Sequence, residues 1–170
     1  VLVAGVLGAF AYRLFLPKAA QAPTLRYSFS FPSDLANHGG SRNRIAISPD
    51  GTRIAYAANN RLYLRYLNSL TSTEVSGVTG AESPVFSPDG SWIAYLHVGD
   101  LMKISVNGGP PIQIGTRVGA PASWSLRDEI LCEGNGKIYL VSAKAGSVIT
   151  LTELNRQSRS YADPQLFPDG

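Results

Sequence analysis

Three aspartates recur in the same local setting, which makes them the first candidates for metal chemistry. Asp50 and Asp89 each lie in a Ser-Pro-Asp-Gly segment, and Asp169 stands between Pro168 and Gly170. Carboxylate oxygens are ligands for hard cations such as Ca²⁺. In a turn, however, an aspartate commonly accepts a hydrogen bond from the backbone two residues later. We therefore interpret all three aspartates as structural turn residues and predict no metal site.

Hydroxyl, thiol and imidazole side chains are the other candidates for chemistry. Ser48 and Ser87 lack the Gly-x-Ser-x-Gly setting of a hydrolase nucleophile. Cys132 lies in an apolar segment with no recognisable base, and we expect it to pack as a small hydrophobic residue. His38 and His97 lie in unlike segments with no second ligand at metal-binding spacing. The sequence thus predicts no catalytic, cofactor or metal site.

The Ser-Pro-Asp-Gly segments belong to an internal repeat. The segment beginning at Ser48 returns at Ser87, with a degenerate copy around Ser125 and a further copy at the end of the sequence. Proline presets φ for the first turn position, and glycine adopts the positive φ that closes the turn. The predicted structural turn residues are Ser48, Pro49, Asp50, Gly51, Ser87, Pro88, Asp89, Gly90, Pro168, Asp169 and Gly170.

Each repeat unit reads as four short strands separated by turns. Four antiparallel strands in about 40 residues match one blade of a β-propeller. We therefore predict an all-β partial propeller of about three four-stranded antiparallel blades, at residues 44–82, 83–121 and 122–163, and a fourth that starts at 164–170. Residues 124–128 depart from the repeat, which makes the first hairpin of the third blade the weakest part of this prediction. A β-sandwich is the alternative.

Residues 1–16 form an apolar run that Arg13 alone interrupts. Sixteen helical residues would span about 24 Å, somewhat less than the ~30 Å hydrocarbon core of a bilayer. We predict a transmembrane helix at residues 1–16, cut at its start. It precedes a linker at 17–26, which contains Pro17, and the propeller at 27–170. A signal peptide and a buried helix are the alternatives.

The composition restricts the partners. The chain of 170 residues is 44% hydrophobic and 16% charged, which excludes a disordered chain. The net charge of +3 is scattered, with no run of Lys and Arg, so we predict no nucleic-acid partner.

Residues 61–65, 79–94 and 108–111, together with the expected helix and linker, resemble the TolB-type, WD-like β-propeller repeat family. The subgroup most similar to them is the C-terminal propeller of bacterial membrane-spanning serine/threonine kinases. The resemblance implies a single-pass protein of the bacterial inner membrane whose extracytoplasmic propeller binds an unknown protein, peptide or small-molecule ligand. The kinase motifs themselves do not occur in this sequence.

Other parent proteins are compatible with the repeat. These are a TolB-like periplasmic interaction protein without signalling output, a membrane-bound transcriptional regulator and a prolyl oligopeptidase-type peptidase. Propellers close with four to eight blades. We therefore also expect that three blades and the start of a fourth do not form a self-sufficient domain.

Overall fold

The computed structural model describes residues 45–153 and 164–166, and all regular structure in this part of the chain is β-strand. Its strands form three separate four-stranded sheets. The first, blade 1, contains β1 (Ile45–Ile47), β2 (Arg53–Ala58), β3 (Arg61–Tyr66) and β4 (Thr73–Glu74). Blade 2 contains β5 (Glu82–Phe86), β6 (Trp92–His97), β7 (Asp100–Ser105) and β8 (Ile112–Gly115). Blade 3 contains β9 (Ala120–Trp124), β10 (Glu129–Gly134), β11 (Lys137–Ser142) and β12 (Val148–Glu153).

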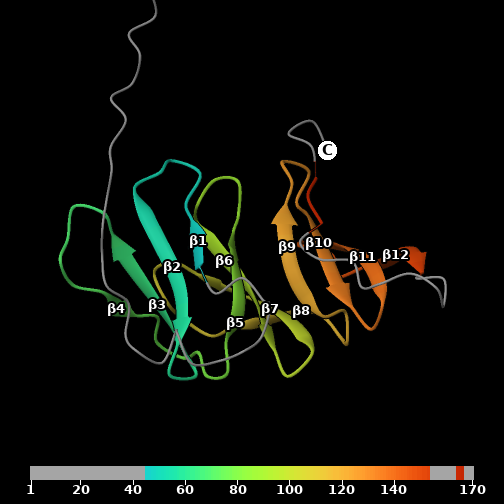
Figure 1. The fold of residues 1–170 in the computed structure, drawn as a ribbon, viewed down its shortest axis with the longest axis horizontal. Helices are drawn as coiled ribbons and strands as arrows, with labels where there is room; N and C mark the ends of the chain where they lie inside the picture. Colours follow the sequence, from blue (N-terminus) through green and yellow to red (C-terminus); the bar gives the residue numbers. More distant parts are fainter. Residues whose placement is uncertain (1–44, 154–163, 167–170) are drawn as a thin grey trace, which may run out of the picture.

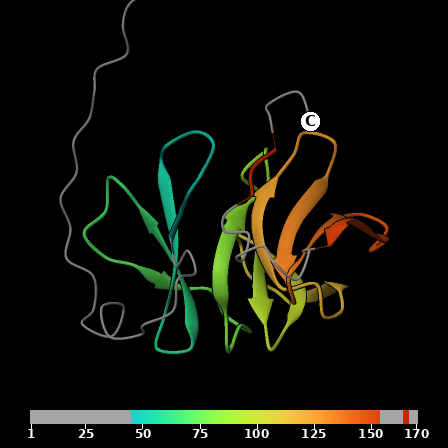
Figure 2. The same cartoon turned by 45° about the vertical axis from the view of Figure 1, so that its right-hand side comes forward.

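Within each blade, strands that follow one another in the sequence pair antiparallel. The blades stand side by side, and β5 contacts both β1 and β9, so the first strands of the three blades are neighbours (Figure 1). The last strands, β4 and β12, lie at opposite outer sides of the molecule (Figure 2). This order, in which the first strands lie inside and the last strands lie outside, is the radial arrangement of propeller blades.

The second strand of each blade is the most deeply buried element, because it is covered on both faces. In β6, the residues from Ile93 to Leu96 are at most 3% exposed, which explains the run of apolar residues without polar alternation. Ile93 and Tyr95 face blade 1, whereas Ala94 faces blade 3. The core is therefore made of layers between blades.

Two such layers hold the described part together. The layer between blades 1 and 2 contains Ala55, Leu62, Leu64, Val75, Val78, Ala81, Phe86, Ile93, Tyr95 and Ile104. The layer between blades 2 and 3 contains Ala94, Leu101, Ile114, Val118, Ile130, Cys132, Val141 and Ala143. Burial of apolar surface at about 25 cal/mol per Å² makes these layers the main attraction between neighbouring blades.

The prediction of an all-β fold with three four-stranded antiparallel blades is confirmed. The sandwich alternative is wrong, because the described strands form three sheets in a row, with the middle sheet packed on both of its neighbours, instead of one pair of sheets. At the start of the fourth repeat, the Leu166 N–H donates to Ser123 Oγ of β9 at 3.1 Å, so this segment lies beside the first strand of blade 3.

Three sequence-based predictions fall outside the described residues: the helix at 1–16, the linker at 17–26 and the turn at Pro168, Asp169 and Gly170. In the part of the chain that the structure describes, no helix is long and apolar enough to cross a membrane.

Candidate functional site

The two Ser-Pro-Asp-Gly segments lie at the turns between the first and second strands of blades 1 and 2. In blade 1, Ser48 Oγ donates to Asp50 Oδ1 at 2.5 Å and accepts the Arg53 N–H at 2.9 Å. The Thr52 N–H donates to Asp50 Oδ1 at 3.0 Å, and Gly51 has φ of +68°. The buried serine hydroxyl therefore joins both sides of the turn.

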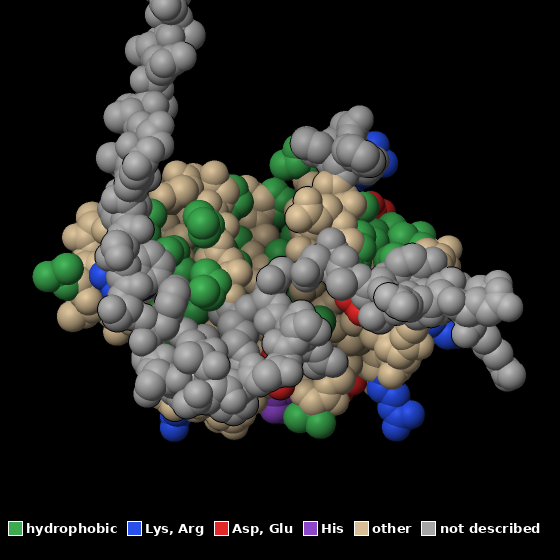
Figure 3. Space-filling view, in the orientation of Figure 1, with side chains coloured by type: hydrophobic (Ala, Val, Ile, Leu, Met, Phe, Trp, Pro, Cys, Tyr) green, Lys and Arg blue, Asp and Glu red, His purple; other side chains and the backbone are tan. Residues whose placement is uncertain are grey.

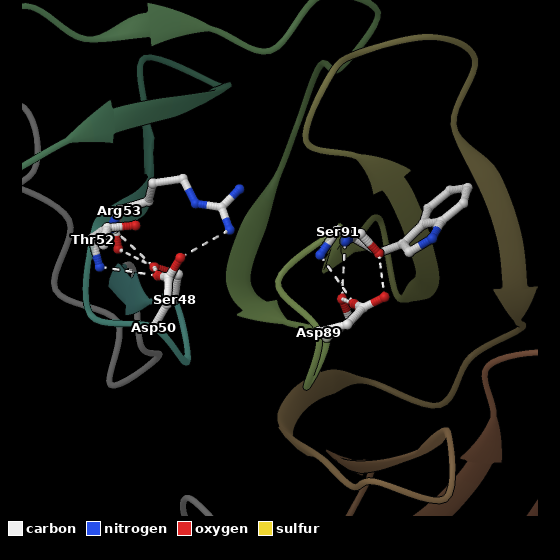
Figure 4. A network of polar contacts seen from close by, with 8 residues as sticks. Ser48, Asp50, Thr52, Arg53, Asp89 and Ser91 are labelled. Atoms are coloured by element: carbon white, nitrogen blue, oxygen red, sulfur yellow. Dashed lines mark hydrogen bonds and ion pairs between the residues drawn. The ribbon is translucent and has the colours of Figure 1, made fainter.

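Blade 2 repeats this geometry. Ser87 Oγ donates to Asp89 Oδ1 at 2.5 Å and accepts the Trp92 N–H at 2.9 Å. Asp89 also accepts the Ser91 N–H at 3.0 Å and the Ser91 hydroxyl at 2.6 Å (Figure 4). Two turns 39 residues apart, Ser48 to Ser87, thus share three hydrogen bonds at the same distances.

These hydrogen bonds stabilise the charged form of both carboxylates. The Ser48 hydroxyl, followed by the Thr52 N–H, lowers the pKa of Asp50 to about 2. The Ser87 hydroxyl, followed by the groups of Ser91, lowers the pKa of Asp89 to about 2. Both aspartates therefore act within their own turns. Among the described residues, no three His, Cys, Asp or Glu side chains gather where they could hold a metal ion.

The corresponding turn of blade 3 is built differently. Ser125 is buried, and its hydroxyl accepts the N–H groups of Arg127 at 3.2 Å and Glu129 at 3.3 Å. Asp128 takes the place of the turn glycine: its φ is +60°, and its N–H donates to the Ser125 carbonyl at 3.1 Å. The turn is one residue shorter than the other two, which explains why the sequence motif is degenerate there.

Two basic side chains link neighbouring blades at this end of the molecule, and sequence reasoning missed both. The Arg53 guanidinium lies 3.7 Å from Asp50 Oδ2 (Figure 4). It also lies 5.7 Å from the centre of the Phe86 ring of blade 2. Lys103 Nζ lies 4.9 Å from the centre of the Trp92 ring and donates to the Ala143 carbonyl of blade 3 at 2.7 Å. The sequence does mark one of these positions as equivalent in two blades, since Arg53 and Trp92 follow the Ser-Pro-Asp-Gly motif at the same spacing.

We call this end of the blades the serine rim; it comprises the turns at 48–52, 87–91 and 125–128. The opposite end is the hairpin rim, which comprises the turns at 59–60, 98–99 and 135–136 and the loops at 75–81 and 116–119. Each of these loops is bonded to the preceding hairpin: the Gly80 N–H donates to the Asn60 carbonyl at 2.7 Å and the Gly119 N–H to the Gly99 carbonyl at 3.3 Å.

The hairpin turns require two residues with positive φ. Asn59 and Asn60 meet this requirement in blade 1, and Asn135 and Gly136 meet it in blade 3. In blade 2 the first position is Val98, with φ of +50° and an exposed fraction of 88%. A β-branched residue with positive φ is strained. Val98 therefore has a strained backbone conformation, and its apolar side chain is exposed to solvent at the tip of a hairpin.

The other candidate residues do not assemble into a reactive group. Cys132 is buried, and burial raises the pKa of its thiol to about 12. Lys103 Nζ contacts the Trp92 ring and the Ala143 carbonyl, as described above. His97 lies at the end of β6, close to Gly80 of the loop at 75–81. The contact is so close that a Cβ added to Gly80 would lie 2.9 Å from His97 Nδ1. His38 lies outside the described residues.

On the face of the described residues drawn in Figure 3, charged side chains do not gather into a single patch. On the face drawn in Figure 3, Lys and Arg are scattered singly around the edge, and Asp and Glu lie between them. Hydrophobic side chains are the larger group on this face (Figure 3). This face therefore shows no basic stripe among the described residues.

No protein-family model and no curated protein sequence matches the chain. Solved structures do match. A TolB-like protein of Agrobacterium tumefaciens aligns over 66% of this chain and 50% of its own, with 18% identity and a TM-score of 0.54. TolB of Acinetobacter baumannii aligns over 65% of this chain and 32% of its own, with 22% identity and a TM-score of 0.54.

The β-propeller domain of the Trilobed protease from Pyrococcus furiosus aligns over 68% of this chain and 43% of its own, with 17% identity and a TM-score of 0.50. This chain therefore spans between 32% and 50% of the length of these three matched chains. The likeness concerns the fold, and it agrees with the blade order and the layered core. The described part of the chain has the fold of a TolB-like β-propeller.

Proposed function

We propose that this chain is a protein-interaction propeller that binds its partner at the hairpin rim. The observation that carries this proposal is the contrast between the two rims. On the serine rim, Asp50 and Asp89 form hydrogen bonds within their own turns, and Arg53 and Lys103 connect blades. On the hairpin rim, two-residue turns present Val98 and the neighbouring Asn and Arg side chains to solvent. Binding residues are typically carried on loops that a rigid scaffold positions.

A photocrosslinking residue at position 98 tests this proposal in bacterial cells that express the chain. Leu126 is the matched control, because it is an apolar turn residue with an exposed fraction of 78%, close to the 88% of Val98, and lies on the serine rim. We expect one discrete protein adduct from position 98 and none from position 126. Equal adducts from both positions, or none from either, would contradict the proposal.

We further propose that the propeller is the extracytoplasmic part of a membrane-anchored signalling protein of the bacterial inner membrane. The support is the apolar run at residues 1–16 and the resemblance to the propellers of serine/threonine kinases. Membrane fractionation of chains with and without residues 1–16 tests the anchor. If both chains remain in the soluble fraction, the anchor does not exist.

The coding sequence upstream of Val1 distinguishes the parent proteins. A kinase domain there supports signalling, and a helix-turn-helix domain supports transcriptional control. A signal peptide alone supports a TolB-like periplasmic interaction protein. A peptidase parent would instead carry its hydrolase domain beyond the propeller.

A further inference from the structure

In blade 2, hydrogen bonds join the loop at 116–119 to the start of β7 and to β8. The Arg117 N–H donates to Asp100 Oδ1 at 2.9 Å. Gln113 Nε2 of β8 donates to Asp100 Oδ2 at 3.2 Å and to Thr116 Oγ1 at 2.9 Å. Both oxygens of the Asp100 carboxylate are thus used to hold this loop beside the hairpin turn at 98–99.

The end of the same loop is held against blade 3. Gly119 has φ of +81°, and its N–H donates to the Gly99 carbonyl. A Cβ added to Gly119 would lie 2.1 Å from the Glu133 carbonyl oxygen and 2.5 Å from the Cα of Gly134 in β10. Only glycine permits so close an approach of two backbones. The loop at 116–119 is therefore fixed between the hairpins of blades 2 and 3.

Two exposed side chains on this fixed unit have a strained backbone. Val98 has φ of +50° and Arg117 has φ of +55°, a region that valine and arginine rarely adopt. Such strain persists only where the surrounding structure enforces it, and it is concentrated at binding sites. The exposed pair Leu126 and Arg127 on the serine rim has similar side chains, but neither residue has a positive φ.

The Arg117 guanidinium is placed to take a carboxylate from outside. Among the described residues, no carboxylate lies within ion-pair distance of it. In blade 1, by contrast, Arg61 stands at the position of Asp100, 39 residues earlier, and its guanidinium pairs with Glu74 of β4. An arginine fork can donate two parallel hydrogen bonds to one carboxylate, which makes arginine specific for this group.

We propose that Val98 and Arg117 together recognise a protein segment in which an aspartate or glutamate lies within three residues of an aliphatic side chain. The carboxylate would accept both hydrogen bonds of the Arg117 fork, and the aliphatic side chain would pack on Val98. The two loops are bonded to each other, so an extended segment of about four residues, ~13 Å long, can contact both. This inference rests on the hairpin rim as the binding surface and adds the chemistry of the partner.

Charge reversal at position 117 tests the proposal in cells that express the full chain with an aliphatic photocrosslinking residue at position 98. We expect Arg117→Glu to lower the yield of the adduct at least tenfold. Arg117→Lys keeps the charge but loses the fork, so it should lower the yield by a smaller factor. Arg127→Glu is the matched control, because it reverses an exposed turn arginine on the serine rim, and it should leave the yield unchanged.

The outcomes separate this inference from the proposed function. An adduct whose yield Arg117→Glu leaves unchanged, or lowers no more than Arg127→Glu does, would overturn the role of Arg117 but keep the hairpin rim as a binding surface. The absence of any adduct from position 98 would overturn both.

The site of the adduct on the partner supplies a readout that a folding defect in Arg117→Glu could not imitate. Mass spectrometry should place the cross-link within three residues of an aspartate or glutamate. Exchange of that acidic residue for lysine should abolish the adduct with the wild-type rim and restore it with Arg117→Glu. A cross-linked segment without an acidic residue, or a reversal that is not restored, would overturn the proposal.

A synthetic peptide of the cross-linked segment tests Val98 itself, by fluorescence anisotropy with the purified chain. Val98→Asn relieves the strain at this position but removes the aliphatic contact. We therefore expect this variant to raise the Kd at least fivefold. An unchanged Kd would overturn the role of Val98 in recognition.

Discussion

The first turns of blades 2 and 3 both join the first strand of the blade to the second, but they do so with different residues. In blade 2, Ser87 is flanked by the full motif, its hydroxyl bonds are 2.5 and 2.9 Å long, and Gly90 has φ of +68°. In blade 3, the bonds to the Ser125 hydroxyl are 3.2 and 3.3 Å long, and Asp128 adopts the positive φ instead of glycine.

The element that both turns keep is the buried serine. Ser87 is 2% exposed and Ser125 is 6% exposed, and each satisfies backbone N–H groups inside its turn. The aspartate two residues after the serine is absent from blade 3, where Arg127 stands instead. The carboxylate of Asp128 pairs with Lys144 at 2.7 Å. The comparison indicates that the hydroxyl closes the turn, while the aspartate strengthens it.

The largest effect should follow from removing the serine hydroxyl in the tighter turn. Ser87→Ala removes the acceptor of the Trp92 N–H and one of the two donors to Asp89 Oδ1, which keeps the Ser91 N–H. A buried donor left unsatisfied costs about 1–3 kcal/mol. Ser125→Ala removes longer bonds and should cost less than half as much. Urea unfolding of both variants measures the difference. An equal or larger loss for Ser125→Ala would show that the comparison is wrong.

Replacing the turn glycine should have the next largest effect. Gly90→Ala forces a Cβ into a left-handed conformation, at about 1–2 kcal/mol, and this Cβ would approach Arg53 Nη2 to 2.6 Å. Gly51 has the same φ of +68° but no atom within 4 Å of its Cβ position, so Gly51→Ala carries the conformational cost alone. Thermal unfolding of both variants measures the two costs separately: Gly51→Ala reports the backbone strain alone, and Gly90→Ala reports the strain together with the displacement of Arg53. If Gly51→Ala is the more destabilising, the contact with Arg53 does not matter.

A smaller effect, of opposite sign, is expected at the hairpin rim. Val98→Asn replaces a β-branched residue at φ of +50° with one that tolerates positive φ and occupies the same position in blades 1 and 3. The left-handed conformation costs about 1–2 kcal/mol for an ordinary residue and less for asparagine, so we expect a gain of up to about 1 kcal/mol in the free energy of unfolding. Ser76→Asn, at an exposed position in the loop after β4, is a control for the introduction of an asparagine elsewhere on the hairpin rim. A loss of stability in Val98→Asn would mean that Val98 contributes packing that outweighs its strain.

The smallest effect is expected in the dependence of folding stability on acidic pH. The pKa of Asp89 is lowered from 3.8 to about 2 in the folded chain, so unfolding takes up a proton between these pH values. Stability from this group is complete above pH 4 and is lost as the pH falls from about 4 to 2. Asp89→Asn should therefore show a smaller drop in melting temperature over this range than the wild-type chain, and adding Asp50→Asn should reduce the drop further. An unchanged drop would show that the turn carboxylates do not couple to folding.

The repeat spacing was sufficient to predict the number of strands per blade and their pairing. Proline, aspartate and glycine at fixed positions restrict the backbone locally, so turns at Ser48 and Ser87 follow from the sequence without knowledge of the rest. The turn of blade 3 was harder to predict, because Ser125 keeps the hydroxyl while one residue is missing and Asp128 replaces glycine.

What the sequence could not show is which side chains meet between blades. Lys103 and Ala143 are 40 positions apart, and Arg53 reaches Phe86 across a blade boundary. Nor could the run of apolar residues in β6 reveal that Ile93 and Ala94 face different blades. Turn chemistry acts between near neighbours in the chain, and so it can be predicted from the order of residues. Contacts between blades depend on the angle and spacing at which whole sheets pack, which are fixed only when the apolar layers close in three dimensions.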